Sequence, residues 1–259
     1  MNNLIRVSFR NDKALASQKV VSQREFPIKT VFCDDKHTYA LVDLKNPEEF
    51  DKYIKALAAY IIGRYESKIL KRIIKKNYPE IPHFAVNEIV KSRDDVDHRE
   101  RTEVVENILK GYFRENKSGN VEGIVNFRFY EYEKLLNAIS EDLVDIYYLN
   151  REYEDFIELL RYFISVQDRR PEMIYLIVNK YGMYTILNEK RQDITNRCLA
   201  EFLSPEDVRR DGYDDLLISI LITLAPEKIM VENKENIKNE QLFETIEKVF
   251  GKVVYKQEQ

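Results

Sequence analysis

The clearest candidates for chemistry are basic side chains at helical spacing between residues 68 and 76. Steps of three and four residues place them on one arc of a helix, because such positions are neighbours on its surface. They are Lys68, Lys71, Arg72, Lys75 and Lys76. Clustered cations can bind the phosphates of nucleic acid or the carboxylates of an acidic protein. The alternative is a solvated helix face, or a face docked on the acidic second half of the chain.

A sixth candidate, Arg128, stands in the apolar segment Asn126-Phe-Arg-Phe129. A buried arginine needs a carboxylate, because an unpaired buried charge is very costly. One interpretation is therefore an internal ion pair with Glu131 or Glu158. The other is an arginine that binds an anion or a partner.

Metal-type ligands occur in two short segments, but neither matches a metal-site pattern. Cys33 and His37 flank two aspartates and a lysine, whereas a structural zinc site needs four ligands. The acidic segment 94–100 lacks the glycine and the spaced glutamate of a calcium loop, and a helix dipole favours acids in its first turn. We predict a hairpin turn at the first segment, a helix start at the second, and no metal or other cofactor.

Catalytic motifs are absent from the sequence, which contains neither Gly-x-Ser-x-Gly nor a phosphate-binding Gly-x-x-x-x-Gly-Lys loop. A carboxylate-dependent enzyme using groups such as Asp214 and Asp215 is an alternative, because such sites leave little trace in sequence. We expect a non-enzymatic protein and predict no catalytic residue.

Composition indicates a folded protein without a membrane span. The 259 residues are 44% hydrophobic and 33% charged, enough apolar content for a core. The longest nearly apolar run, residues 216–225, is shorter than the roughly 20 residues that cross a bilayer. The chain has no visible secretory signal and only 2 cysteines, so we predict a cytoplasmic location.

Charge and turn signals predict a division at residue 120. Residues 1–120 carry 23 Lys and Arg against 18 Asp and Glu, a net charge of +5, and residues 121–259 carry 18 against 27, a net charge of −9. The polar segment 115–120 is typical of a linker. We therefore predict a basic N-terminal region over 1–120, with a β-hairpin and helices, and an acidic α+β region over 121–259.

In the first region, alternation predicts a strand over 4–9, and the runs 28–33 and 38–42 predict a hairpin. Asn46 followed by Pro47 predicts a helix start. The apolar stripe of that helix changes face near Glu66-Ser67, so one straight helix cannot bury both parts. Either the helix bends there, or its second part packs on another partner. A further helix is predicted over 94–111, with Val105 and Leu109 inward.

In the second region, residues 130–149 and 152–167 predict an antiparallel helix pair or one long kinked helix. Phe156 is among the apolar residues expected in the core, where truncation to alanine would cost about 3–5 kcal/mol. A cost near zero would mean that this face binds a partner instead. The runs 173–178 and 183–187 predict a hairpin, and residues 228–256 a strand, a helix and a strand. Residues 214–225 could be a buried helix or a buried strand, and the flanking residues favour the helix.

Four segments of the second half occur in a fixed order. They are Gly123-Ile-Val-Asn-Phe-Arg-Phe-Tyr-Glu-Tyr132, Glu152-Tyr-Glu-Asp-Phe-Ile-Glu-Leu-Leu-Arg-Tyr-Phe163 with Gln167, Asp215-Leu-Leu-Ile-Ser-Ile-Leu-Ile-Thr-Leu-Ala-Pro226, and Glu244-Thr-Ile-Glu-Lys-Val-Phe-Gly251. Together they resemble the YtxC-like family of sporulation proteins of endospore-forming bacteria, over residues 120–255. The resemblance implies a role in sporulation and a cytoplasmic setting, and it supplies no active-site residue.

We therefore predict a predominantly helical α+β protein, with short N-terminal strands and a small C-terminal mixed sheet. The function we expect is that of a sporulation-associated accessory factor that binds an unknown protein partner. A nucleic-acid-binding accessory that uses residues 68–76 is the alternative.

Overall fold

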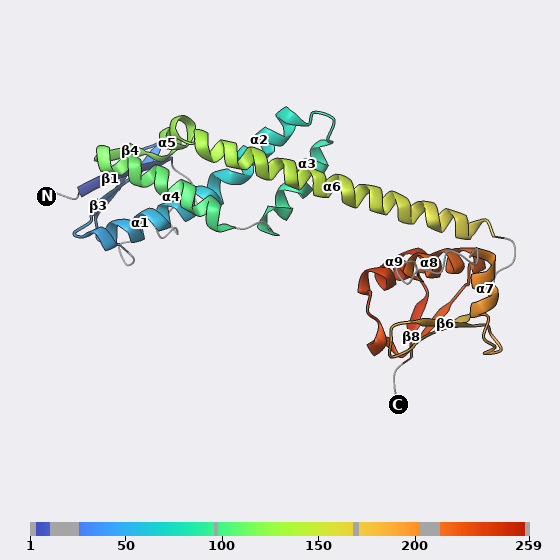
Figure 1. Ribbon diagram of the computed structural model, residues 1–259. Coiled ribbons are helices and arrows are strands. Elements are labelled where there is room, and N and C mark those ends of the chain that lie inside the picture. Colours follow the sequence, from blue (N-terminus) through green and yellow to red (C-terminus); the bar gives the residue numbers. More distant parts are fainter. Residues whose placement is uncertain (1–3, 11–25, 96–97, 168–170, 203–212, 257–259) are drawn as a thin grey trace. The chain divides into compact units, whose positions relative to one another are not determined.

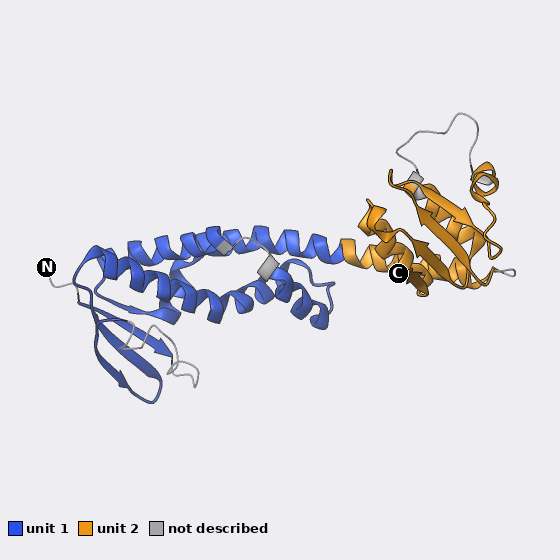
Figure 2. Ribbon diagram, turned by 90° about the horizontal axis from the view of Figure 1, so that it is seen from below, with its two compact units in different colours: residues 1–148 blue, residues 149–259 orange. Residues whose placement is uncertain are grey.

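The structure, a computed structural model, describes residues 4–10, 26–95, 98–167, 171–202 and 213–256 (Figure 1). The chain forms two compact units, residues 1–148 and residues 149–259 (Figure 2). Each unit combines a small sheet with helices, and helices predominate. The predicted α+β class is therefore confirmed.

Unit 1 contains a four-stranded sheet in the order β2-β3-β1-β4. The strands are β1 (Leu4–Arg10), β2 (Ile28–Cys33), β3 (His37–Asp43) and β4 (Ser118–Asn120). β1 runs antiparallel to β3, with Val7 opposite Ala40, and parallel to β4. The predicted first strand and hairpin are confirmed. Alternate β1 side chains enter the core, where Val7 and Phe9 are fully buried.

Helix α1 (Pro47–Ile61) begins where the sequence predicts, with the Asn46 side chain accepting a hydrogen bond from the Glu49 amide at 2.8 Å. It continues through a π-helical turn (Ile62–Glu66) into α2 (Ser67–Asn77). A π-turn adds one residue to the α-helical repeat. Buried positions therefore pass from Ile61 directly to Glu66 and then to Ile69. The π-helical turn accounts for the predicted change of face, because it allows the apolar stripes of α1 and α2 to pack into one core.

The other helices of unit 1 surround the same core (Figure 1). They are α3 (His83–Lys91), the 3-10 turn Ser92–Asp95, α4 (His98–Glu115), α5 (Val121–Arg128) and the first part of α6 (Tyr130–Ser165). Val105 and Leu109 of α4 are buried, as predicted.

The compact units divide between Tyr148 and Leu149, inside α6, and not at residue 120. The segment with linker-like composition is ordered instead. β4 pairs with β1, and Asn120 caps α5 by accepting from the Gly123 amide at 2.8 Å. Gly119 packs so closely against the Tyr112 ring that a side chain would not fit, since a Cβ there would lie 2.8 Å from the ring. Glycine and asparagine at this point therefore serve packing and capping.

Unit 2 has its own four-stranded mixed sheet, in the order β6-β5-β7-β8. β5 (Ile174–Val178) and β6 (Tyr184–Leu187) form the predicted hairpin, and β7 (Ile229–Glu232) and β8 (Val253–Tyr255) are parallel strands joined through α9 (Glu240–Phe250). Gly251 ends α9 with a φ of 68°, a conformation that favours glycine. Helices α7 (Thr195–Phe202) and α8 (Tyr213–Leu224) complete the unit. The predicted hairpin, helix and strand-helix-strand are confirmed. The helix is buried on one face, at Leu217, Ile220 and Leu221.

Helix α6 is a single 36-residue helix, so the antiparallel pair does not form. In unit 2, its residues Ile157, Leu160 and Ile164 are buried in a cluster with Ala225 and Val249. Phe156 is 48% exposed, and its predicted place in the core is wrong.

Glu232 provides unit 2 with a pH-dependent contribution to stability. It is buried and accepts hydrogen bonds from Arg191 at 2.8 Å and from Lys256 at 3.4 Å. The Arg191 bond lowers the pKa of Glu232 against the opposing effect of burial. Because the folded pKa lies below the unfolded one, this contribution is present at neutral pH and is lost as pH falls through the folded pKa.

We therefore expect Glu232→Gln to destabilise unit 2 at neutral pH and to have a much smaller effect in acid. Urea unfolding at about pH 7 and about pH 3 measures this difference. Glu227→Gln, at an exposed position, is the matched control. A Glu232→Gln effect that is equal at both pH values would contradict the linkage.

Candidate functional site: the basic face of α2

All five predicted cations lie on the outer side of α2, opposite the buried Ile69, Leu70, Ile73 and Ile74. Lys71 is half-buried, and Lys68, Arg72, Lys75 and Lys76 are exposed. We call these five residues the basic face. The spacing that predicted one arc is thus confirmed, because α2 is a regular helix with its apolar side in the core.

A buried polar cluster at the π-turn fixes the orientation of α2. Glu66 is 2% exposed and accepts hydrogen bonds from Arg101 at 2.7 Å and from the Tyr132 hydroxyl. Arg93 lies 3.2 Å from the same carboxylate. Burial, followed by the bond to Glu66, raises the pKa of Tyr132. Three separate helices, α2 through its preceding turn, α4 and α6, thus meet at one carboxylate.

Sequence reasoning missed this cluster. The available signal was the change of face near Glu66-Ser67, since a helix that switches register there can turn a glutamate inward. This local signal could not identify the hydrogen-bond partners of Glu66, because Arg101 is 35 residues away from it in sequence and Tyr132 is 66 residues away.

The cations of the basic face differ in their contacts. Arg72 forms an ion pair with Glu133 of α6, and Lys68 lies 5.9 Å from the centre of the Tyr65 ring. In the part of the chain that the structure describes, no ion pair involves Lys71, Lys75 or Lys76.

The turn between α5 and α6 presents exposed aromatic rings beside further cations. Phe127 is 84% exposed and Tyr130 is 71% exposed, and the Lys134 ammonium lies 4.9 Å from the Tyr130 ring centre. Arg128 is exposed, so its interpretation as a buried internal ion pair is wrong. We call Phe127, Arg128, Tyr130 and Lys134 the aromatic turn.

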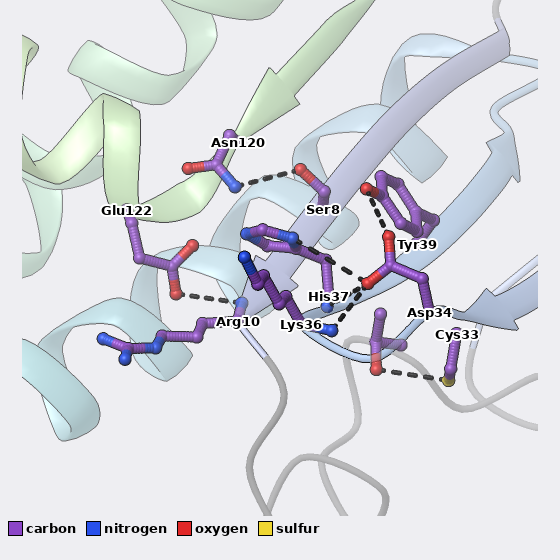
Figure 3. Close-up of polar contacts among 10 residues, drawn as sticks. Ser8, Arg10, Cys33, Asp34, Lys36, His37, Tyr39, Asn120 and Glu122 are labelled. Carbon is purple, nitrogen blue, oxygen red and sulfur yellow. Dashed lines mark hydrogen bonds and ion pairs between the residues drawn. The ribbon is translucent and has the colours of Figure 1, made fainter.

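Two contacts join the aromatic turn to the helix that carries the basic face. Arg72 pairs with Glu133, which lies between Tyr130 and Lys134 in sequence. The Tyr65 hydroxyl donates to Glu122 of α5 at 2.7 Å, and burial together with this bond raises the pKa of Tyr65. Glu122 also accepts from the Arg10 amide at 3.0 Å, next to the Asn120–Ser8 bond (Figure 3). The six predicted residues therefore lie on elements that are directly bonded to one another.

Carboxylates lie close to this surface as well. Glu141 and Asp145 of α6 are exposed, and with Glu80 they add to the effect of burial in raising the pKa of Tyr78, which follows α2. The surface around α2 is thus basic along the helix and acidic beyond its C-terminal end.

The segment around Cys33 forms the predicted hairpin turn (Figure 3). One Asp34 oxygen accepts from the amides of Lys36 at 2.7 Å and His37 at 2.6 Å, and the other accepts from the Tyr39 hydroxyl. The two backbone bonds are the main reason that the pKa of Asp34 is lowered. Cys33 lies 3.3 Å from the hydroxyl of Thr38. The aspartate therefore shapes the turn, as a residue of this type commonly does.

Among the carboxylates considered for catalysis or ion binding, Asp214 forms hydrogen bonds within the fold. Asp214 accepts from Tyr184 at 3.0 Å and from Asn239 at 2.7 Å, which ties α8 to β6 and to the start of α9. The side chains of Asp215, Asp94, Asp95 and His98, together with residues 96–97, lie outside the described part. Within the described residues, no three His, Cys, Asp or Glu side chains are grouped as metal ligands.

Comparison with known proteins places the chain in a family. The model of the YtxC-like family matches residues 51–255. A relative from Bacillus subtilis (strain 168), called uncharacterized protein YtxC, is 24% identical over 132 residues, or 50% of this chain and 45% of that protein. The aligned part therefore spans less than half of this relative. No solved structure matches the chain significantly, and no helix in the described ranges has the length and apolarity needed to span a bilayer. Because the family model covers most of its length, the chain belongs to the YtxC-like family.

Proposed function

We propose that this protein is a non-catalytic accessory factor in sporulation whose basic face docks an acidic partner protein. The observation that carries the proposal is the set of three lysines, Lys71, Lys75 and Lys76, which make no ion pair within the described residues and lie on a helix bonded to the aromatic turn. The sporulation context is what the family resemblance implies.

The mixed chemistry of this surface favours a protein partner. Protein interfaces combine aromatic anchors with a charged rim, and Phe127 and Tyr130 are exposed rings next to cations. A nucleic-acid groove instead needs continuous positive charge along the phosphates. Glu131, Glu133 and Glu141 interrupt the positive charge on the neighbouring α6.

Reversing two charges of the basic face tests the proposal. We expect Lys71→Glu with Lys75→Glu to weaken capture of the partner from sporulating cells about tenfold or more, because like charges then face each other. The matched control reverses Lys45 and Lys55, two exposed lysines of unit 1 outside this face. Quantitative mass spectrometry should find one acidic protein that the wild type and the control retain and the face variant loses. Equal retention by all three proteins would count against this function.

Nucleic acid is the second candidate, because aromatic rings beside cations can also stack on bases. Fluorescence anisotropy with single-stranded and double-stranded oligonucleotides separates the two functions. Binding that falls steeply with salt and disappears in the Lys71→Glu, Lys75→Glu variant would favour nucleic acid over an acidic protein.

A further inference from the structure

The part of α6 that belongs to unit 2 has apolar side chains on two faces. One face packs inside the unit through Ile157, Leu160 and Ile164. The other carries six large apolar residues that are each 46–64% exposed: Leu149, Phe156, Leu159, Tyr162, Phe163 and Val166. We call these six residues the α6 stripe. Val166 extends the helical turn, since its amide donates to the Tyr162 carbonyl at 3.3 Å.

The stripe is large enough to form an interface. A large apolar side chain has roughly 150–200 Å² of surface, so six that are about half exposed offer roughly 500–600 Å². Two such stripes in contact would bury about 1,000–1,200 Å², which reaches the roughly 1,000 Å² expected of a specific interface. This area lies at the upper end of the roughly 300–600 Å² that the largest apolar patch of a typical monomer covers, and such patches often mark interaction sites.

The spacing of the stripe makes it complementary to a second copy of itself. Leu149, Phe156 and Phe163 recur every seven residues, and Leu159 and Val166 occupy the second seam of the same heptad pattern. In an antiparallel pair centred between residues 157 and 158, Leu149 meets the partner's Val166, and Phe156 meets the partner's Leu159. A two-fold interface requires this kind of self-complementarity.

Glu152 favours the antiparallel direction for such a pair. It is exposed and occupies the remaining seam position of the heptad pattern. In a parallel pair it would face Glu152 of the partner subunit, and like charges in contact are destabilising. In the antiparallel pair it faces the partner's Phe163, and its carboxylate can extend into water at the rim.

We infer that the protein forms a two-fold dimer in which the α6 stripes of two copies pack antiparallel. The inference concerns unit 2 and does not depend on the partner proposed for the basic face of unit 1. Each copy would keep its own core contacts, because Ile157, Leu160 and Ile164 are already buried within unit 2 and flank the stripe along one side.

Sedimentation equilibrium of the full chain tests the dimer. We expect a dimer mass for the wild type and a monomer mass for Phe156→Glu with Leu159→Glu, because these changes place carboxylates opposite each other near the two-fold axis. Phe127→Glu with Tyr130→Glu is the matched control, since it changes exposed aromatic residues outside the stripe, and it should remain a dimer. A monomeric wild type, or a stripe variant that stays dimeric, would overturn the inference.

Disulfide cross-linking tests the direction without relying on a destabilising change. In a Cys33→Ser background, a mixture of Leu149→Cys and Val166→Cys chains should form the mixed cross-link. Leu149→Cys alone should not cross-link to itself, because the two copies of residue 149 lie at opposite ends of an antiparallel pair. A Leu149→Cys homodimer cross-link without the mixed product would overturn the antiparallel arrangement.

Discussion

Glu66→Ala should lower the free energy of unfolding of unit 1 by about 3–5 kcal/mol, because it removes one partner of a buried ion pair. Arg101 is 1% exposed and donates to Glu66 at 2.7 Å. After the substitution its charge stays in the interior without this acceptor. The Tyr132 hydroxyl loses its acceptor as well, and an unsatisfied buried hydroxyl adds to the cost.

Two further variants separate the effect of the charge from that of packing. Glu133→Ala breaks the exposed pair with Arg72 and should cost less than about 1 kcal/mol. Replacing Glu66 by leucine together with Arg101 by methionine removes both charges of the buried pair and should recover part of the lost stability. The recovery is partial because Tyr132 and Arg93 still lack their carboxylate. A smaller loss for Glu66→Ala than for Glu133→Ala would contradict the role of the cluster.

Hydrogen exchange is the appropriate measurement, since a chain with two units need not unfold in a single step. Amides of α2 and α4 should lose protection in Glu66→Ala, whereas amides of β5 and β7 in unit 2 should keep it. Denaturation followed by circular dichroism then gives the free energy for the transition assigned to unit 1.

Local rules predicted most elements of the fold. The Asn46 cap, the hairpin at residues 28–42 and the Gly251 helix end all depend on neighbours within a few residues, and the structure has each of them. Composition was a poorer guide to the division of the chain. Gly119 and Asn120 are typical of a linker, yet a tight contact with Tyr112 and a helix cap explain both residues.

Periodicity predicted the basic face but could not show what surrounds it. Regular helical spacing places the five cations of the basic face on the outside whenever Ile69 and Leu70 are inside. The Arg72–Glu133 pair and the exposed Phe127 depend on how distant helices pack, which a single sequence does not encode locally. For the same reason, the sequence indicated a register change at Glu66 without revealing its buried partners.

The misplacement of Phe156 has a geometric cause. Residues 153–164 carry apolar side chains over a wide arc of α6, and periodicity alone treats the whole arc as one buried face. In the structure, only the part of the arc that includes Ile157, Leu160 and Ile164 is covered. An apolar arc that is wider than one neighbouring layer can bury therefore indicates a second, exposed apolar surface on the same helix.

Phe243→Ala should destabilise unit 2 by about 3–5 kcal/mol, which is the usual cost of removing a buried phenylalanine. Phe243 lies on α9, is 3% exposed, and packs with its ring centre 6.0 Å from that of Tyr184. Its removal leaves a cavity in the cluster that joins α9 to the sheet. Urea unfolding, with hydrogen exchange in β5 and β7 to identify the unit, measures the loss.

Phe156→Ala is the matched comparison, because it makes the same chemical change in the same unit at a surface position. At protein concentrations where the chain is monomeric, we expect it to change the free energy of unfolding by less than about 0.5 kcal/mol, as surface substitutions usually do. At higher concentrations the same variant should show a larger loss, since binding of a second copy stabilises the folded state by mass action. A concentration-dependent cost at Phe156 beside a constant cost at Phe243 would thus distinguish a residue that stabilises an assembly from one that stabilises the fold. A loss of several kcal/mol at Phe156 in dilute solution would instead place its ring in a core.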